Sequence, residues 1–196
     1  VQVFHGKSTN TSELPKNTRL SYHRLDTDNL SPGQYNMLLK DQKFWEKVHG
    51  SGKVLIMQTD SAFCGNPKSP KLNDIKSYGY LGCSSSDFGV GGFSLRDKAT
   101  MLRCTKGVEP QEGGEDVFFS SCGKERAKKG GTAKPMPQTF RDMAEFCVEY
   151  VTEVGEKHKD LTPPLGVHVS NISDKTWDFI EKTCPAARHL KRPGSS

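Results

Sequence analysis

A short apolar run at residues 54–57 (Val-Leu-Ile-Met) restricts the fold more than any other feature of the sequence. Residues 50–52 (Gly-Ser-Gly) come before it, and an amphipathic helical pattern extends from about residue 32 to residue 48. Four consecutive apolar residues bounded by glycine fit a strand buried on both faces, as in a parallel sheet. A helix, a turn and such a strand in this order predict an α/β fold, with a mostly parallel mixed sheet flanked by helices.

Length and composition favour a single domain. The 196 residues suffice for one core, and a hydrophobic fraction of 33% with a mean hydropathy of −0.66 indicates extensive surface. We assign residues 1–184 to this domain and residues 185–196 to a disordered tail. Because the chain opens directly in a strand-like run, we expect it to be truncated at the N-terminus. No apolar run reaches the roughly 18 residues of a spanning helix, so no transmembrane segment is expected.

The net charge of +5 and the six cysteines leave partners and compartment open. A basic excess favours polyanionic partners in general. The basic stretch at residues 124–134 has no interleaved aromatic residues, so we expect no nucleic acid. The even number of cysteines is compatible with disulfides, but no C-x-x-C spacing predicts a zinc site. Cys147 lies in an apolar run and is expected to be a buried free thiol.

Three polar motifs are candidates for chemistry, and each has an ordinary structural alternative. Asp60 follows the apolar run, where open α/β sheets bind ligands, so its carboxylate suits a Mg²⁺ or Mn²⁺ ion or, alternatively, an Asx turn. Gly91 and Gly92 let a backbone approach a ligand closely, or form an ordinary loop before a strand. Glu115 and Asp116 offer a general base, or complement the dipole of a helix.

The order of these motifs resembles that of GT-A glycosyltransferases, which carry an acid motif after a buried strand, a glycine loop, an acid pair and a C-terminal histidine. More closely, the chain is similar to a GT-A-like family with the signatures QTDS, Y-x-Y-[IL]-G, GGFSLR, EDVFF and PLGxH. These signatures stand at residues 58–61, 78–82, 91–96, 115–119 and 164–168. The match extends over about residues 3–168 and implies a single GT-A-like (Rossmann-like) domain.

The resemblance implies a role for each matching residue. Asp60 resembles the acid that faces the metal, and His168 the histidine that completes the coordination of a divalent cation, Mn²⁺ or Mg²⁺. Asp116 matches the base that takes a proton from the acceptor hydroxyl, and Glu115 would help to hold the acceptor. Arg96 would neutralise a phosphate or, alternatively, form a surface ion pair. The positions implied for contact with donor and acceptor are Thr59, Asp60, Gly91, Gly92 and Arg96.

The resemblance therefore implies a glycosyltransferase that moves a sugar from a nucleotide-diphosphate donor to a hydroxyl of a glycan, protein or small molecule. The compartment stays open between the cytoplasm and the Golgi lumen. Three positions depart from the family pattern. Asp60 is the single carboxylate where a full DxD motif has two, and Val90 and Gly79 stand where asparagine and aspartate are expected. These departures support a second hypothesis, a non-catalytic GT-A-like module that binds a sugar nucleotide or a glycan.

Overall fold

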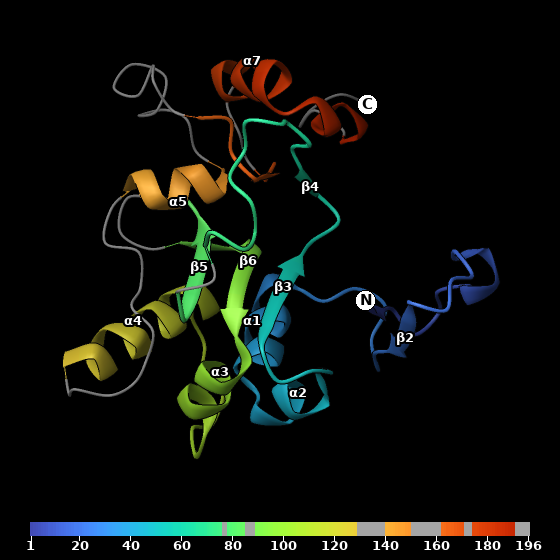
Figure 1. Cartoon of the computed structure of the whole chain (residues 1–196). Coiled ribbons are helices and arrows are strands. Elements are labelled where there is room, and N and C mark those ends of the chain that lie inside the picture. Colours follow the sequence, from blue (N-terminus) through green and yellow to red (C-terminus); the bar gives the residue numbers. More distant parts are fainter. Residues whose placement is uncertain (76–77, 85–88, 129–139, 150–161, 171–173, 191–196) are drawn as a thin grey trace.

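The computed structural model describes residues 1–75, 78–84, 89–128, 140–149, 162–170 and 174–190, and it is a mixed α/β arrangement with three small sheets (Figure 1). No helix in these ranges is both long and apolar enough to cross a membrane. The helices are α1 Pro32–Lys40, α2 Gln42–Lys47, α3 Lys98–Thr105, α4 Glu115–Lys128, α5 Phe140–Phe146 and α7 Asp174–Thr183, with the 3-10 helices η1 Thr11–Glu13 and η2 Pro185–His189. The strands are β1 Gln2–His5, β2 Ser21–Arg24, β3 Lys53–Met57, β4 Ser61–Phe63, β5 Tyr80–Cys83, β6 Val90–Asp97, β7 Cys147–Val148 and β8 Gly166–His168.

The central sheet has the strand order β3-β6-β5, and both of its pairings are antiparallel. Lys53 lies opposite Asp97, and Met57 lies opposite Phe93. The prediction of a mostly parallel sheet is therefore wrong; in the described ranges only β1–β2 and β7–β8 pair in parallel. β3 is an edge strand and is half-buried, with Met57 44% exposed, so it is not covered on both faces. An apolar run favours a strand but does not specify its neighbour or the direction of pairing.

The helix predicted for residues 32–48 is two helices, α1 and α2. Ser31 caps α1 as expected: its hydroxyl accepts a hydrogen bond from the Gln34 N–H, and the Gln34 side chain accepts one from the Ser31 N–H. Asp41 has an extended backbone, and its carboxylate accepts a hydrogen bond from the Lys43 N–H at 2.9 Å. Asp41 therefore caps α2 and interrupts the longer helix.

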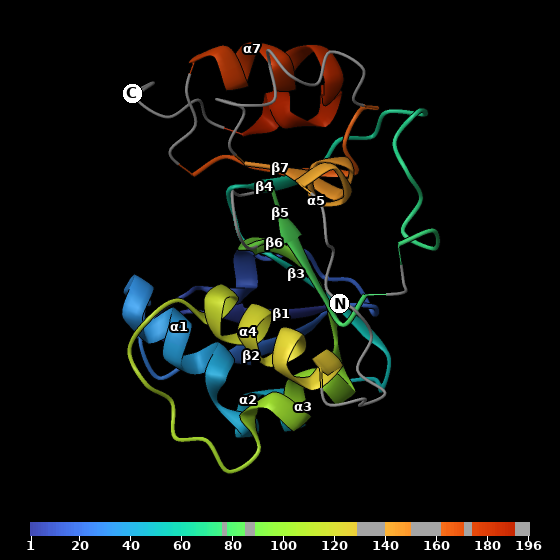
Figure 2. The ribbon, with the colours of Figure 1, turned by 90° about the vertical axis from the view of Figure 1, so that its left-hand side faces the viewer.

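Helices α1–α4 enclose an aromatic core against the central sheet. Figure 2 shows these four helices gathered around one end of the sheet, with α5 and α7 beyond the other end. The rings of Trp45 and Phe119 meet edge to face with centroids 6.0 Å apart, and Trp45 Nε1 donates a hydrogen bond to the Leu39 carbonyl at 2.6 Å. The one polar atom of the Trp45 ring is therefore satisfied inside the core. The buried side chains of this core are Leu39, Phe44, Trp45, Val48, Tyr80, Met101, Cys104 and Phe119.

A second sheet, with the strand order β4-β8-β7, brings distant segments of the chain together. β4 and β8 are antiparallel with Ser61 opposite His168, and β7 pairs with β8 in parallel. Helix α7 packs against this sheet through Trp177 and Ile180, which are buried with Val167. The sheet fixes the position of the turn that precedes β4 and of the residue that ends β8.

All six cysteines form disulfides, which join Cys64 to Cys184, Cys83 to Cys147 and Cys104 to Cys122. The prediction of a free thiol at Cys147 is wrong. An apolar neighbourhood suits a thiol and a disulfide equally. The partner Cys83 is 64 residues away and becomes adjacent only when β5 and β7 come together.

The segment predicted as a disordered tail, residues 185–196, is ordered at its start. Pro185–His189 forms η2, and Ala187 is fully buried next to Cys184. Two features account for this order: the disulfide from Cys184 to Cys64, and the proline at the first position of the helix. Residues 191–196 lie outside the described ranges.

Candidate functional site

The turn after β3 and the end of β8 meet at the candidate metal site. Asp60 lies in this turn beside the exposed Thr59, and His168 is the last residue of β8. Because Ser61 lies opposite His168 in the β4–β8 pair, the turn brings Asp60 directly to the imidazole. His168 Nε2 lies 3.3 Å from Asp60 Oδ1 and 3.0 Å from Gln58 Oε1. The two residues predicted as metal ligands are therefore neighbours.

The other ring nitrogen of His168 faces a buried carboxylate. Nδ1 lies 2.9 Å from Glu149 Oε2, and Glu149 Oε1 accepts a hydrogen bond from the Ser170 hydroxyl at 2.6 Å. Burial lowers the pKa of His168, but the contacts with Asp60 and Glu149 outweigh burial and raise this pKa to about 9. The hydrogen bond from His168 in turn lowers the pKa of Asp60, against the effect of its partial burial. His168 is thus held between two carboxylates.

The atoms around His168 Nε2 suit a hard divalent cation. Asp60 Oδ1, Gln58 Oε1 and His168 Nε2 are a carboxylate oxygen, an amide oxygen and an imidazole nitrogen, which are ligands of Mn²⁺ and Mg²⁺. The Asp60 side chain is 43% exposed, so an ion can reach it from solvent. Glu149 stands behind Nδ1, where a carboxylate commonly orients a metal-binding histidine. The residues present fit the expected cation, which would have to displace the proton from His168 Nε2.

Gly91 and Gly92 lie inside strand β6, so the prediction of a glycine loop next to the ligand is wrong for these two positions. Both glycines are buried, and the space beside each Cα is already filled. A Cβ at Gly91 would overlap the carboxylate of Glu115 and crowd the Arg96 guanidinium, and a Cβ at Gly92 would overlap the imidazole of His168. Because Gly91 and Gly92 have no side chain, the buried side chains of Glu115 and His168 have room beside β6.

Replacing Gly92 by alanine is expected to lower the free energy of unfolding by about 1–3 kcal/mol, because the new Cβ would push the buried His168 ring from its place. Gly52→Ala is the matched control: a Cβ there meets no atom within 4 Å, so its effect should stay within about 1 kcal/mol. Denaturation in urea measures both variants. Equal effects would contradict a packing role for Gly92.

Arg96 and Glu115 form a buried ion pair. The guanidinium donates two hydrogen bonds to the carboxylate, at 2.6 and 2.8 Å, and the two side chains are 0% and 3% exposed. Arg96 Nε also donates to the Ser94 hydroxyl at 2.9 Å, and the guanidinium lies over three aromatic rings of the core, 5.0–5.8 Å from their centroids. Burial lowers the pKa of Arg96, but Glu115 outweighs this and raises it. In this arrangement neither side chain has an exposed atom to offer to a phosphate or an acceptor.

Asp116 is the half-buried member of the acid pair and lies in the first turn of α4. Its Oδ1 accepts a hydrogen bond from the Val117 N–H at 2.8 Å. Burial raises the pKa of Asp116, which makes its carboxylate a stronger base. Burial raises the pKa of Tyr35 in α1 to about 12, against the charge of Arg96, which lowers it.

Sequence reasoning assigned no role to Tyr35, Gln58 or Glu149. Apolar residues at helical spacing after Thr139 predict one helix over residues 139–151, which would include Glu149, but α5 ends at Phe146 and β7 follows. Residues 139 and 150–151 lie outside the described ranges. The run Val-Glu-Tyr-Val-Thr at residues 148–152 is rich in β-branched and aromatic residues, which is the signal that favours a strand there. Gln58 stands in the QTDS signature itself, whereas nothing in the sequence singles out Tyr35.

Comparisons with known proteins identify one family. A family model described as "Protein of unknown function (DUF5672)" matches residues 19–168. Large ribosomal subunit protein uL11 of Amoebophilus asiaticus (strain 5a2) is 33% identical over 69 residues, which are 32% of this chain and 47% of that protein. The chain thus spans about half the length of this curated relative, too little to show a shared family. No solved structure matches the chain.

Proposed function

This chain belongs to the DUF5672 family, and we propose that it is a GT-A-like glycosyltransferase that transfers a sugar from a nucleotide-diphosphate donor to an acceptor hydroxyl. The acceptor is a hydroxyl of a glycan, a protein or a small molecule. One observation carries the proposal: Asp60 and His168, which the resemblance assigns to the metal, lie 3.3 Å apart although they are far apart in the sequence.

Asp60 and His168, with Gln58 beside them, would hold Mn²⁺ or Mg²⁺. Bound there, the cation supplies positive charge close to the departing diphosphate. The lowered pKa of Asp60 keeps its carboxylate ionised and ready to bind a cation. Glu149 orients the His168 ring so that Nε2 faces Asp60. These residues therefore have the charge and the orientation that a cation site needs.

Asp116 is proposed as the general base. The acceptor oxygen forms a bond to the anomeric carbon of the sugar, the bond from that carbon to the diphosphate breaks, and the proton of the acceptor hydroxyl passes to the Asp116 carboxylate. A single displacement of this kind inverts the configuration of the anomeric carbon. The support for this role is the resemblance at this position, together with the partial burial of Asp116 and its raised pKa.

A binding module without turnover is the second candidate function. The observation that favours it is the buried pair of Arg96 and Glu115, whose charges neutralise each other away from solvent. The turn after β3 also has a single carboxylate, Asp60, where a full DxD motif has two. In this alternative the chain would hold a sugar nucleotide or a glycan at the same place. The enzyme requires Asp116 as a base, whereas the binding module does not. A substitution of Asp116 therefore tests which of the two functions is correct.

The disulfides favour the Golgi lumen over the cytoplasm as the compartment of the proposed enzyme. Disulfides persist in oxidising compartments and are rare where thiols are kept reduced. Here they join all six cysteines, and one of them links residues 120 positions apart. We therefore propose a lumenal or secreted location.

Asp60→Asn is expected to weaken Mn²⁺ binding by about tenfold or more, because it removes the charged oxygen beside His168 Nε2. Electron paramagnetic resonance of unbound Mn²⁺ measures the affinity of the whole chain. Asp26→Asn changes an exposed aspartate and should leave Mn²⁺ binding unchanged. Equal affinity of the unsubstituted chain and the Asp60→Asn variant would contradict a metal site in this turn.

A further inference from the structure

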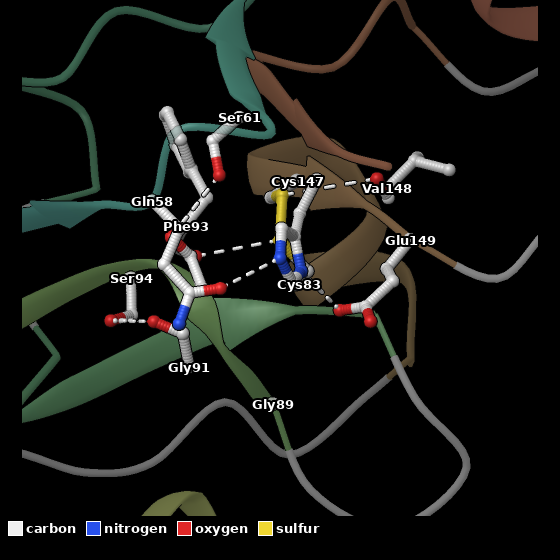
Figure 3. The surroundings of a disulfide bond; sticks show 12 residues. Gln58, Ser61, Cys83, Gly89, Gly91, Phe93, Ser94, Cys147, Val148 and Glu149 are labelled. Carbon is white, nitrogen blue, oxygen red and sulfur yellow. Dashed lines mark hydrogen bonds and ion pairs between the residues drawn. A yellow bond between two sulfur atoms is a disulfide. The ribbon is translucent and has the colours of Figure 1, made fainter. Parts of the chain in front are cut away.

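A second cluster of metal-binding groups lies on the Nδ1 side of His168, away from Asp60. It consists of Cys83, Glu149 and His168, whose ligand atoms lie within 4.8 Å of one another. All three side chains are buried. Figure 3 shows the Glu149 carboxylate joined by a dashed line to an imidazole nitrogen, that of His168, beside the Cys83–Cys147 disulfide. The groups come from β5, β8 and the segment after β7, so the fold itself brings them together.

Two polar atoms in this cluster pair only with each other within the described part of the chain. They are Glu149 Oε2 and His168 Nδ1, which face each other at 2.9 Å. Glu149 is 1% exposed and His168 is 4% exposed, so solvent does not reach them. Buried polar atoms are nearly always paired, and here the imidazole and the carboxylate pair with each other. A metal ion that displaces the Nδ1 proton would accept a lone pair from each of the two atoms.

Cys83 Sγ can bind a metal together with Glu149 and His168 only when its disulfide with Cys147 is broken. A metal binds the thiolate form of cysteine, and in the oxidised chain Cys83 Sγ is bonded to Cys147 instead. Two molecules of a thiol reductant convert this disulfide to two cysteine thiols and become a disulfide themselves. Each thiol then loses its proton when its sulfur binds a metal. Reduction therefore frees Cys83 Sγ next to the imidazole and the carboxylate, and Cys147 Sγ beside it.

We propose that reduction of the Cys83–Cys147 disulfide creates a zinc site with Cys83, Cys147, Glu149 and His168 as ligands. Two sulfurs, one nitrogen and one carboxylate oxygen match the number and the kind of ligands that tetrahedral zinc takes. His168 binds through Nδ1, which leaves Nε2–H free to donate to Gln58 Oε1 at 3.0 Å. The zinc ion takes over the link between β5 and β7 that the disulfide provides in the oxidised chain. The site does not depend on sugar transfer.

Cobalt(II) is the probe, because a thiolate ligand gives it a sulfur-to-cobalt charge-transfer band. The whole chain is reduced with a phosphine and titrated with Co²⁺, alongside the oxidised chain. We expect the band in the reduced chain alone, with its loss on addition of Zn²⁺. Cys83→Ser should remove the band, whereas a Cys104→Ser/Cys122→Ser variant, which lacks the most local disulfide, should keep it. Asp60→Asn should also keep the band, which separates this site from the proposed Mn²⁺ site.

The proposal is overturned if the Cys83→Ser variant keeps the band, or if the reduced chain shows none while circular dichroism reports an intact fold. A refolding experiment decides the matter if the reduced chain unfolds. Reduced, denatured chain is oxidised with and without Zn²⁺, and the disulfides are mapped over time. Zinc should delay the Cys83–Cys147 disulfide several-fold relative to Cys64–Cys184. Equal rates for these two disulfides with zinc present would also overturn the proposal.

Discussion

Replacing Glu115 by alanine is expected to lower the free energy of unfolding by about 3–5 kcal/mol, because it leaves the Arg96 charge buried without a partner. In water a lone cation is solvated, but the Arg96 side chain is 0% exposed and is surrounded by aromatic rings. The Gly91 carbonyl at 3.3 Å and the Ser94 hydroxyl at 2.9 Å are neutral and cannot replace the carboxylate. The midpoint temperature of thermal unfolding should fall by roughly 6–20 °C for a chain of this size.

An exposed ion pair provides the control for this prediction. Arg141 and Glu145 are one helical turn apart with side chains 64% and 33% exposed, so Glu145→Ala should cost less than about 1 kcal/mol. Replacing both buried partners, as Arg96→Met with Glu115→Leu, should recover much of the lost stability because no buried charge remains. If Glu115→Ala is as mild as Glu145→Ala, the buried pair is not intact in solution.

Asp116→Asn is expected to lower the turnover of sugar transfer by about 10²–10⁴-fold, because asparagine has a similar shape but cannot accept the proton of the acceptor hydroxyl. The affinity for the nucleotide-sugar donor should stay unchanged. Since burial raises the pKa of Asp116, the base form is lost as the pH falls through a value above that of an ordinary aspartate. As the pH is lowered, the rate of the unsubstituted chain should therefore begin to fall at a higher pH than it would with an ordinary aspartate. The Asp116→Asn variant should not show this fall in rate.

Glu112→Gln is the matched control for Asp116, because it removes an exposed acid from the loop just before α4. Steady-state kinetics with the donor that binds the chain should show the same turnover for Glu112→Gln as for the unsubstituted chain. An undiminished rate in Asp116→Asn would contradict the assignment of the base. Donor binding without measurable turnover in either chain would favour the binding module.

Features encoded over a few residues could be predicted from the sequence. Ser31 and Gln34 form the capping box that their spacing favours. The pattern of residues 97–104 predicts a helix, which forms as α3 with Asp97 as its cap. The proximity of Asp60 and His168 followed from the order of motifs along the chain, because a matched set of signatures carries information about three-dimensional neighbours that no single motif contains.

Features that depend on distant partners could not be predicted. Residues 54–57 indicate a strand, but its antiparallel pairing with β6 is set by the rest of the sheet. Cys147 finds Cys83 only through the contact of β5 with β7. Adjacent acids look alike in the sequence, yet Glu115 turns inward to Arg96 while Asp116 remains half-exposed. Pairing of this kind is decided by tertiary packing rather than by local propensity.

The central claim is that the chain binds a nucleotide-diphosphate sugar with the help of a divalent cation at Asp60 and His168. Thermal unfolding of the chain against a panel of nucleotide sugars, with and without Mn²⁺, tests it most directly. A donor present at about 100 times its dissociation constant should add about 2.7 kcal/mol to the free energy of unfolding. We expect at least one nucleotide sugar to stabilise the chain in the presence of Mn²⁺, and Asp60→Asn to abolish this effect. A folded chain whose unfolding temperature stays the same across the whole panel would contradict the claim.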